Sequence, residues 1–330
     1  MPEVRVDPLT GLRAIVAADR GSRPGGWAHL QAPAAAIDPE TDPFASGHED
    51  RTPPEVYAVR PDGSAPDTPG WTVRVVPNKY PALVADGPEP VPSHAPDLFT
   101  ATAARGAHEV IVNAPDGVTS LGDLRVEQVA EAMEVWRARM AHHVAAGAAC
   151  VHLLVNERLE GGASLPHTHA QLYALDFVPA QLARERERFT AHATRTMGGN
   201  LLQDLVQEEV RQRERLVAID DEAVLLAPYA SRLPYQLLLA PRTPRARFED
   251  AGPLGAALLH DALQRLRRVL RGTMPPLNLW VRTAPRGADR FCWRIDIVPR
   301  LTHLAGLELG TGVHLNIVAP ERAADELRAA

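Results

Sequence analysis

Alternation of residue types near the middle of the chain predicts a strand with one chemically distinctive face. Between residues 164 and 175 the sequence reads Ser-Leu-Pro-His-Thr-His-Ala-Gln-Leu-Tyr-Ala-Leu. At the two-residue period of a strand, small or apolar side chains share one face: Thr168, Ala170, Leu172 and Ala174. Polar or aromatic side chains share the other: His167, His169, Gln171 and Tyr173. The pattern therefore predicts two imidazoles and a carboxamide in a row, roughly 6–7 Å apart, opposite a packed face.

One order of elements is predicted twice along the chain. In the first half, strands are expected near 71–76, 109–113, 150–156 and 164–175, with an amphipathic helix over 125–146. In the second half, strands near 222–227, 235–240, 277–283 and 291–298 accompany a helix over 253–271. The repeat indicates an internal duplication in which only the first copy carries His-x-His.

Composition is that of an ordinary soluble protein. Of the 330 residues, 45% are hydrophobic and 23% are charged. The formal net charge of −6 argues against a general nucleic-acid-binding protein. No segment is long and apolar enough to suggest a membrane span, and the N-terminus has no secretory signal pattern. Because the two cysteines, Cys150 and Cys292, cannot build a disulfide framework, we expect a reducing cytoplasmic location.

The His-x-His pair permits three interpretations. The imidazoles can be buried structural groups, can ligate a metal ion, or can include a nucleophile for phosphoryl or nucleotidyl transfer. A metal site needs further ligands, for which the candidates are Asp42, His48, Glu49 and His108, and the spacing carries no metal signature.

The sequence around the pair favours the nucleophile. The preceding segment at 160–164, Glu-Gly-Gly-Ala-Ser, has backbone N–H groups and a hydroxyl that could face an anion. Gln171 adds an amide donor that cannot release a proton, which favours a stable covalent intermediate that is passed to a second substrate.

The segment Pro-His-Thr-His-Ala-Gln at 166–171, preceded by Asn156 and Ser164, resembles the active-site sequence of galactose-1-phosphate uridylyltransferases. These enzymes form the His-x-His-x-Gln transferase branch of the histidine-triad superfamily. Further segments resemble the family in the same order along the chain: residues 7–10 with Arg20 and Arg23, then 78–83, 108–112 and 305–312. The resemblance implies an α+β fold, a duplicated histidine-triad-like architecture of two antiparallel sheets with packed helices. We expect residues 1–179 to form the half with the catalytic strand and residues 180–330 the half without catalytic histidines.

The resemblance also implies residue roles. His169 would attack the α-phosphorus of a nucleoside diphosphate sugar and release a sugar 1-phosphate, and a second sugar 1-phosphate would then attack the nucleotidyl-histidine. Gln171 and Ser164 would hold phosphoryl oxygens beside His167. Contacts to the nucleotide and its phosphates are expected from Arg20, Arg23, Asn78, Lys79, Asn156, Gly161 and Gly162. Sugar contacts are expected from Glu308 and Gly306, with Glu308 reaching across the interface of a homodimer.

The chain departs from the family at its zinc site. Many relatives bind zinc through Cys-x-x-Cys, a further histidine and the first histidine of the signature. The corresponding positions here are Asp42, Ala45, Gly117 and His167. Because one or two weak ligands cannot hold tetrahedral zinc, we expect the zinc site to be lost and no cofactor to be required.

The substrates are less closely specified. The expected reaction is uridylyl transfer between UDP-glucose and a hexose 1-phosphate such as galactose 1-phosphate. Residues 310–316, Gly-Thr-Gly-x-x-x-Asn, also resemble a branch with ADP-sugar and dinucleoside-tetraphosphate phosphorylases, in which phosphate is the acceptor. A third hypothesis is a catalytically decayed nucleotide-binding protein, against which the intact His169, Gln171 and Ser164 argue.

Overall fold

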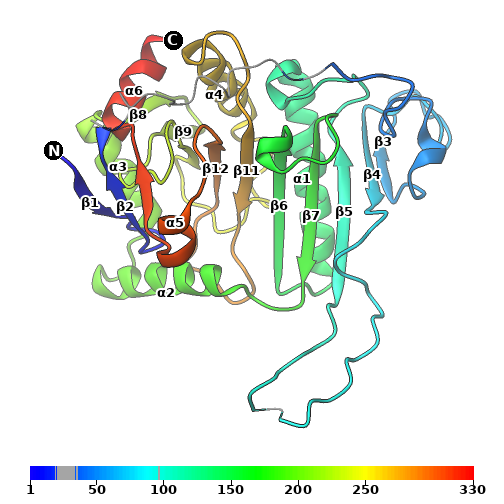
Figure 1. Ribbon diagram of the computed structural model, residues 1–330, viewed down its shortest axis with the longest axis horizontal. Coiled ribbons are helices and arrows are strands. Elements are labelled where there is room, and N and C mark those ends of the chain that lie inside the picture. Colours follow the sequence, from blue (N-terminus) through cyan, green and yellow to red (C-terminus); the bar gives the residue numbers. More distant parts are fainter. Residues whose placement is uncertain (19, 21–33, 35, 96) are drawn as a thin grey trace.

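A continuous antiparallel sheet of ten strands forms the centre of the molecule. The computed structural model describes residues 1–18, 20, 34, 36–95 and 97–330. The strands of this sheet follow one another in the order β3 (Tyr57–Val59), β4 (Val73–Pro77), β5 (Gly106–Val112), β7 (His169–Leu175), β6 (Cys150–Glu157), β11 (Leu277–Arg282), β12 (Arg294–Pro299), β10 (Leu237–Pro241), β9 (Ala223–Leu226) and β8 (Leu216–Ile219) (Figure 1). The antiparallel α+β fold expected from the sequence is confirmed.

The order of strands shows how the two halves are joined. From the boundary between β6 and β11, one half runs outward as β6, β7, β5, β4 and the other as β11, β12, β10, β9. Asn156 of β6 pairs with Asn278 of β11 across this boundary. The two expected sheets therefore meet edge to edge and form one surface, and the catalytic strand β7 lies near its middle with neighbours on both sides.

Two helices cover one face of the sheet. Helix α1 (Val126–Ala145) contacts β4, β6 and β7, helix α4 (Ala256–Val269) contacts β9 and β10, and the two helices also contact each other. On α1 the buried side chains Val129, Met133, Trp136 and Met140 follow the spacing predicted from the sequence. They pack against the apolar face of β7, formed by Ala170, Leu172 and Ala174. This core fixes which side of β7 remains available for chemistry.

The opposite face is covered by different segments in the two halves. In the second half, Phe189 of α2 (Ala180–Arg195) and Leu202 and Val206 of α3 (Leu201–Gln212) pack on Leu226 and Leu238 of the sheet. In the first half, a loop with Phe44 packs on Val76, Val110 and Val112, among other residues. Connecting segments of the described chain include the short 3-10 helices η3 (Glu49–Arg51), η4 (Leu121–Asp123) and η5 (Leu159–Gly161).

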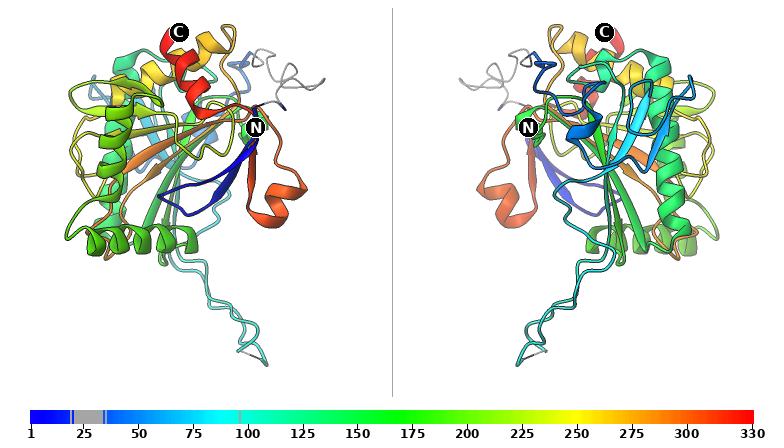
Figure 2. Two further views of the ribbon diagram at one scale, coloured as in Figure 1. Left: turned by 90° about the vertical axis from the view of Figure 1, so that its left-hand side faces the viewer. Right: turned by 90° about the vertical axis from the view of Figure 1, so that its right-hand side faces the viewer.

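A second, three-stranded sheet joins the two ends of the chain. Strand β1 (Glu3–Val6) is antiparallel to β2 (Arg13–Val16), which in turn is parallel to β13 (His314–Asn316). This sheet and helix α5 (Gly306–Thr311) project on the side away from α1 (Figure 2), and helix α6 (Pro320–Ala329) follows. Leu9 packs in the core of the second half, and Arg5 pairs with Glu321. The expected division at residue 179 therefore places residues 1–16 in one half although they pack on the other.

Among the described residues, none of the helices combines the length and the apolar character needed to cross a bilayer.

A buried ion cluster ties the sheet to its covering helix α1. Glu109 of β5 accepts hydrogen bonds from Arg139 Nε at 3.0 Å and His143 Nε2 at 2.9 Å, both on α1. Burial alone would raise the pKa of Glu109, but the hydrogen bonds and positive charge of these partners outweigh it and lower the pKa to about 2.

Replacing Glu109 with Gln is expected to lower the free energy of unfolding by about 3 kcal/mol at neutral pH, because Arg139 and His143 lose their buried carboxylate partner. Since the folded pKa lies below the ordinary 4.5, the carboxylate stabilises the fold fully above that pH and ever less as the pH falls toward about 2. The difference between wild type and variant in urea unfolding should shrink over that range. The matched control is Glu134→Gln, which removes a carboxylate on α1 that is 51% exposed. Equal losses in both variants would contradict the assignment.

Candidate active site

His169 is the first residue of β7 and has its protonation state set by burial and one hydrogen bond. His169 is only 4% exposed. Its Nδ1 lies 2.8 Å from the carbonyl oxygen of His167, which can only accept, so Nδ1 carries the proton. Burial lowers the pKa of His169, while the bond to the carbonyl opposes that effect. The imidazole is therefore neutral at neutral pH and keeps an unshared electron pair on Nε2.

His167 does not share the open face of β7 with His169. It precedes the strand and is fully buried, with Nδ1 at 2.6 Å from Asp42 Oδ2 and Nε2 at 2.9 Å from the carbonyl oxygen of Ala114. Burial alone would raise the pKa of Asp42. Its hydrogen bonds, first of all the one with His167, outweigh burial and lower the pKa. The His167 ring, like that of His169, lies edge-on to Phe44, with 6.1 Å between centroids, but both of its nitrogens already have partners distant in sequence. Its role is to hold the loop at Asp42 against the start of β7.

A pocket of about 360 Å³ opens beside His169. Several residues expected from the sequence line it together: His169, Gln171, Ser164, Asn78 and Lys79. Apolar walls come from the loop and the sheet, with Phe44, Val76, Val110 and Leu165. The Phe44 ring also meets the His169 ring edge-on, with 5.3 Å between centroids. The pocket thus combines a neutral imidazole, hydroxyl and amide donors, one lysine and an apolar wall.

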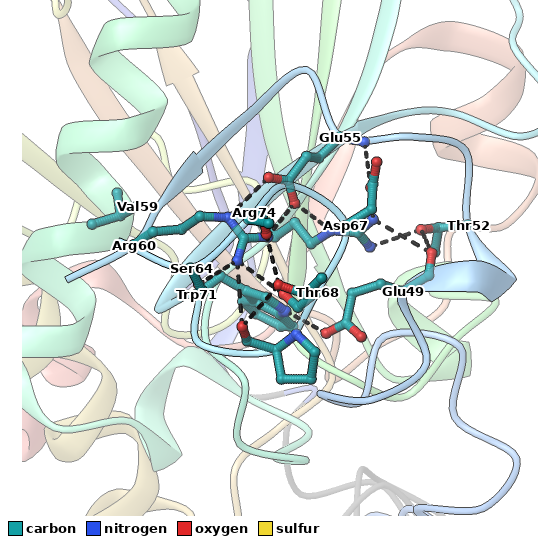
Figure 3. A network of polar contacts seen from close by, with 12 residues as sticks. Glu49, Thr52, Glu55, Val59, Arg60, Ser64, Asp67, Thr68, Trp71 and Arg74 are labelled. Atoms are coloured by element: carbon teal, nitrogen blue, oxygen red, sulfur yellow. Dashed lines mark hydrogen bonds and ion pairs between the residues drawn. The ribbon is translucent and has the colours of Figure 1, made fainter. Parts of the chain in front are cut away.

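The sequence analysis missed Arg51 and Thr52, which also line the pocket. They lie in a segment rich in Pro, Ala, Asp and Gly, where no periodic pattern marks a functional residue. Behind them a buried network fixes the loop to β4 (Figure 3). The Arg74 guanidinium donates to Thr52 Oγ1 at 2.7 Å, Glu55 Oε2 at 3.0 Å and Asp67 Oδ1 at 2.6 Å. Because Arg74 is only 2% exposed, these bonds hold the pocket wall in place.

The glycine loop is used differently from expectation. The Gly161 N–H donates to the Arg158 carbonyl, and the Gly162 N–H donates to the Leu159 carbonyl. Gly161 passes so close to β11 that a Cβ atom would lie 2.7 Å from the Leu277 carbonyl oxygen. The structure therefore corrects the prediction that these N–H groups face an anion: Gly161 and Gly162 close the turn, and Gly161 allows η5 to approach β11 closely.

Other expected binding residues lie outside the pocket. Asn156, on β6 just beyond the pairs that β6 forms with β7, accepts a hydrogen bond from Asn278 Nδ2 at 2.7 Å and so links the two halves. Arg20 is exposed and does not line the pocket, and Arg23 lies outside the described residues. Glu308 and Gly306 belong to α5, where Glu308 Oε2 accepts from the Ala305 N–H. The described part of one chain therefore does not bring α5 to the pocket beside His169.

The equivalent place in the second half contains ions instead of the histidine and glutamine at the start of β7. Strand β12 occupies the position of β7 and carries Arg294 and Asp296. Arg294 contacts Glu185 at 3.0 Å and Asp296 at 3.2 Å, all three buried. The cavity beside Arg294 measures about 30 Å³, close to the size of one water molecule. The second half thus keeps the scaffold and fills the corresponding site with a salt-bridge cluster.

The four positions that correspond to the family's zinc ligands do not fit a zinc ion. Ala45 and Gly117 have no donor atom, and Asp42 and His167 are bonded to each other. In the part of the chain that the structure describes, no group of three or more His, Cys, Asp or Glu side chains is arranged to hold a metal. Tetrahedral zinc needs four such donors.

Comparisons of the sequence with known proteins identify its family and its relatives. The N-terminal domain model of galactose-1-phosphate uridyl transferase matches residues 1–179, and a domain of unknown function, DUF4921, matches residues 106–330. The chain is 26% identical to ADP-glucose phosphorylase of Arabidopsis thaliana over 99% of this chain and 92% of that protein. It is 29% identical to galactose-1-phosphate uridylyltransferase of Haemophilus influenzae over 76% of this chain and 75% of that protein.

The fold agrees with a solved structure over its whole length. The crystal structure of the Arabidopsis thaliana ADP-glucose phosphorylase with bound ADP-glucose superposes with a TM-score of 0.81 and 24% identity, over 100% of this chain and 99% of that one. The family model covers more than half of the chain and includes the strand that carries His169. This chain belongs to the galactose-1-phosphate uridyl transferase family.

Proposed function

We propose that the protein is a nucleotidyltransferase that transfers a nucleoside monophosphate from a nucleoside diphosphate hexose through a covalent bond to His169. The observation that carries the proposal is the state of this residue. His169 is neutral, its Nδ1–H is held by the His167 carbonyl, and the residue lines a 360 Å³ pocket. A histidine so arranged needs no further base, because it has no proton to lose before attack.

The proposed step forms the Nε2–P bond and breaks the bond between the α-phosphorus and the bridging oxygen. The leaving hexose 1-phosphate departs as an anion and needs no proton from the enzyme. The positive charge that develops on the imidazole is stabilised by the His167 carbonyl at Nδ1. Gln171 and Ser164 supply donors for the non-bridging oxygens, and Lys79 adds a positive charge at the pocket.

The acceptor completes the cycle by the reverse attack on the nucleotidyl-histidine. A hexose 1-phosphate is the acceptor in the family to which the chain belongs, and we propose UDP-glucose and galactose 1-phosphate as the principal pair. Inorganic phosphate is a second candidate. It is favoured by the match with an ADP-glucose phosphorylase, which covers 99% of this chain, against 76% for the Haemophilus influenzae uridylyltransferase.

We further propose that the active unit is a homodimer in the cytoplasm. Glu308 and Gly306 lie on a helix that projects from the molecule and does not line the pocket of its own chain (Figure 2). Leu309 on the same helix is 75% exposed, which suits a covered surface. Both cysteines are buried and free, as expected in a reducing compartment.

Brief incubation with a donor substrate is expected to add one nucleoside monophosphate to the wild-type chain, and none to His169→Asn. UDP-glucose, ADP-glucose and diadenosine tetraphosphate are tested separately, and intact-mass spectrometry reads the adduct. His152→Asn is the matched control, because His152 is a mostly buried histidine on the neighbouring strand β6. An adduct of equal yield on His169→Asn would contradict the proposal.

The same experiment assigns the acceptor. The isolated adduct is treated with galactose 1-phosphate or with inorganic phosphate, and the mass is measured again. Loss of the adduct with galactose 1-phosphate, together with formation of a nucleotide sugar, supports the transferase. Loss only with phosphate, with release of a nucleoside diphosphate, assigns a phosphorylase.

We also propose that the protein works without zinc. Elemental analysis of the purified protein should find far less than one zinc per chain, and chelation should leave the melting temperature unchanged. Asp42→Ala, in contrast, should lower the free energy of unfolding by about 3 kcal/mol, because it leaves His167 buried without its carboxylate partner. One tightly bound zinc per chain, with unfolding on its removal, would overturn this proposal.

A further inference from the structure

The carboxamide of Gln171 is held at its oxygen by two neighbouring side chains. Gln171 Oε1 lies 3.1 Å from the Tyr173 hydroxyl and 3.2 Å from His108 Nε2. His108 stands opposite Tyr173 in the pairing of β5 with β7, and the two rings stack with 4.0 Å between centroids. The amide oxygen thus points at β5 and Tyr173.

The tautomer of His108 follows from a third contact. The Ala82 backbone N–H donates to His108 Nδ1 at 3.2 Å, so Nδ1 must be unprotonated. Burial lowers the pKa of His108, which keeps the ring neutral, and the single ring proton then resides on Nε2. His108 is therefore a donor to Gln171 Oε1 and an acceptor from the Ala82 backbone.

A second amide meets the same imidazole. Asn78 Oδ1 accepts from the Tyr80 backbone N–H at 2.8 Å, and Asn78 Nδ2 lies 3.1 Å from His108 Nε2. Because Nε2 already carries a proton, it cannot accept from Asn78. Among the described residues no acceptor is found for the Gln171 amide nitrogen, and Gln171 lines the pocket beside His169.

We infer that His108 is a positioning residue that fixes the polarity of the pocket, so that Gln171 presents its N–H donors to the phosphoryl group of the substrate. An unrestrained carboxamide can flip about its last side-chain bond, so that its oxygen and nitrogen exchange positions. Here the exchange would place the amide N–H groups of Gln171 against His108 Nε2–H, which can only donate, whereas the Tyr173 hydroxyl could turn to accept. The pocket therefore selects an anion, whose oxygens only accept.

This inference rests on the proposed function, since the anion it describes is the phosphoryl group that His169 would attack. It assigns a role to a residue outside the His-x-His-x-Gln sequence. It also explains why the carboxamide can serve as a donor without being a source of protons. His108 acts through Gln171 and need not touch the reacting atoms.

The test compares His108→Phe, His108→Gln and His152→Phe with wild type. Phenylalanine removes the ring proton and the acceptor, whereas glutamine can supply both an N–H and an oxygen at the same place. His152 is the matched control, because it stands opposite Tyr173 on the other side, on β6, and makes no hydrogen bond to Gln171 among the described residues. Affinities for UMP, AMP, uridine and adenosine are measured by calorimetry.

His108→Phe should weaken binding of the monophosphate about tenfold relative to the nucleoside, as expected for one donor lost to a charged oxygen. It should slow formation of the nucleotidyl adduct by at least as much. His108→Gln and His152→Phe should keep the wild-type ratio of monophosphate to nucleoside affinity. A purely structural role of His108 would weaken both ligands alike, and that result, or an unchanged ratio, would overturn the inference.

Tyr173→Phe keeps the test decisive if His108→Phe does not fold. It removes only one hydroxyl from Gln171 Oε1 and should lower the same affinity ratio by about twofold to threefold. An unchanged ratio in folded Tyr173→Phe would count against the inference. Failure of the proposed function is recognised separately, because wild type would then form no adduct with any donor.

Discussion

The hydrogen bond from His169 Nδ1 to the His167 carbonyl fixes the position of a single proton, and the chemistry of the pocket depends on it. With that proton bound, the opposite nitrogen keeps its electron pair. The geometry in turn depends on the place of β7, which is paired on both sides near the middle of a ten-stranded sheet and packed below by α1. A histidine at the start of such a strand has little freedom to turn, so the nucleophile is ordered before the substrate arrives.

The loop that closes the pocket is held by ion pairs. Asp42 bonds to His167 at one end, and Arg74 gathers Glu55 and Asp67 at the other. Both central groups, His167 and Arg74, are almost completely buried. The ion cluster of Arg74 stabilises one arrangement strongly once every partner is present, because the loss of a carboxylate leaves the buried guanidinium charge without compensation. The pocket wall with Phe44, Arg51 and Thr52 is thus held by these contacts between side chains.

Local patterns predicted the elements well and the long-range contacts poorly. The strand predicted from the alternation over 169–175 and the helix predicted from the apolar spacing in α1 are both present, because each pattern marks a packed face. His167 differed because its partner Asp42 is 125 residues away. The joining of the halves through Asn156 and Asn278 likewise depends on the register between distant strands. The importance of His108 was hidden for the same reason, since Gln171 and Asn78 meet it only in the folded chain.

The central claim, that His169 carries the nucleotide between two half-reactions, is tested most directly by isotope exchange. Labelled glucose 1-phosphate is incubated with unlabelled UDP-glucose or ADP-glucose and enzyme, with no other acceptor present. A covalent intermediate predicts that label enters the nucleotide sugar with wild type and not with His169→Asn. No exchange by wild type with a donor that it demonstrably consumes, or equal exchange by His169→Asn, would contradict the claim.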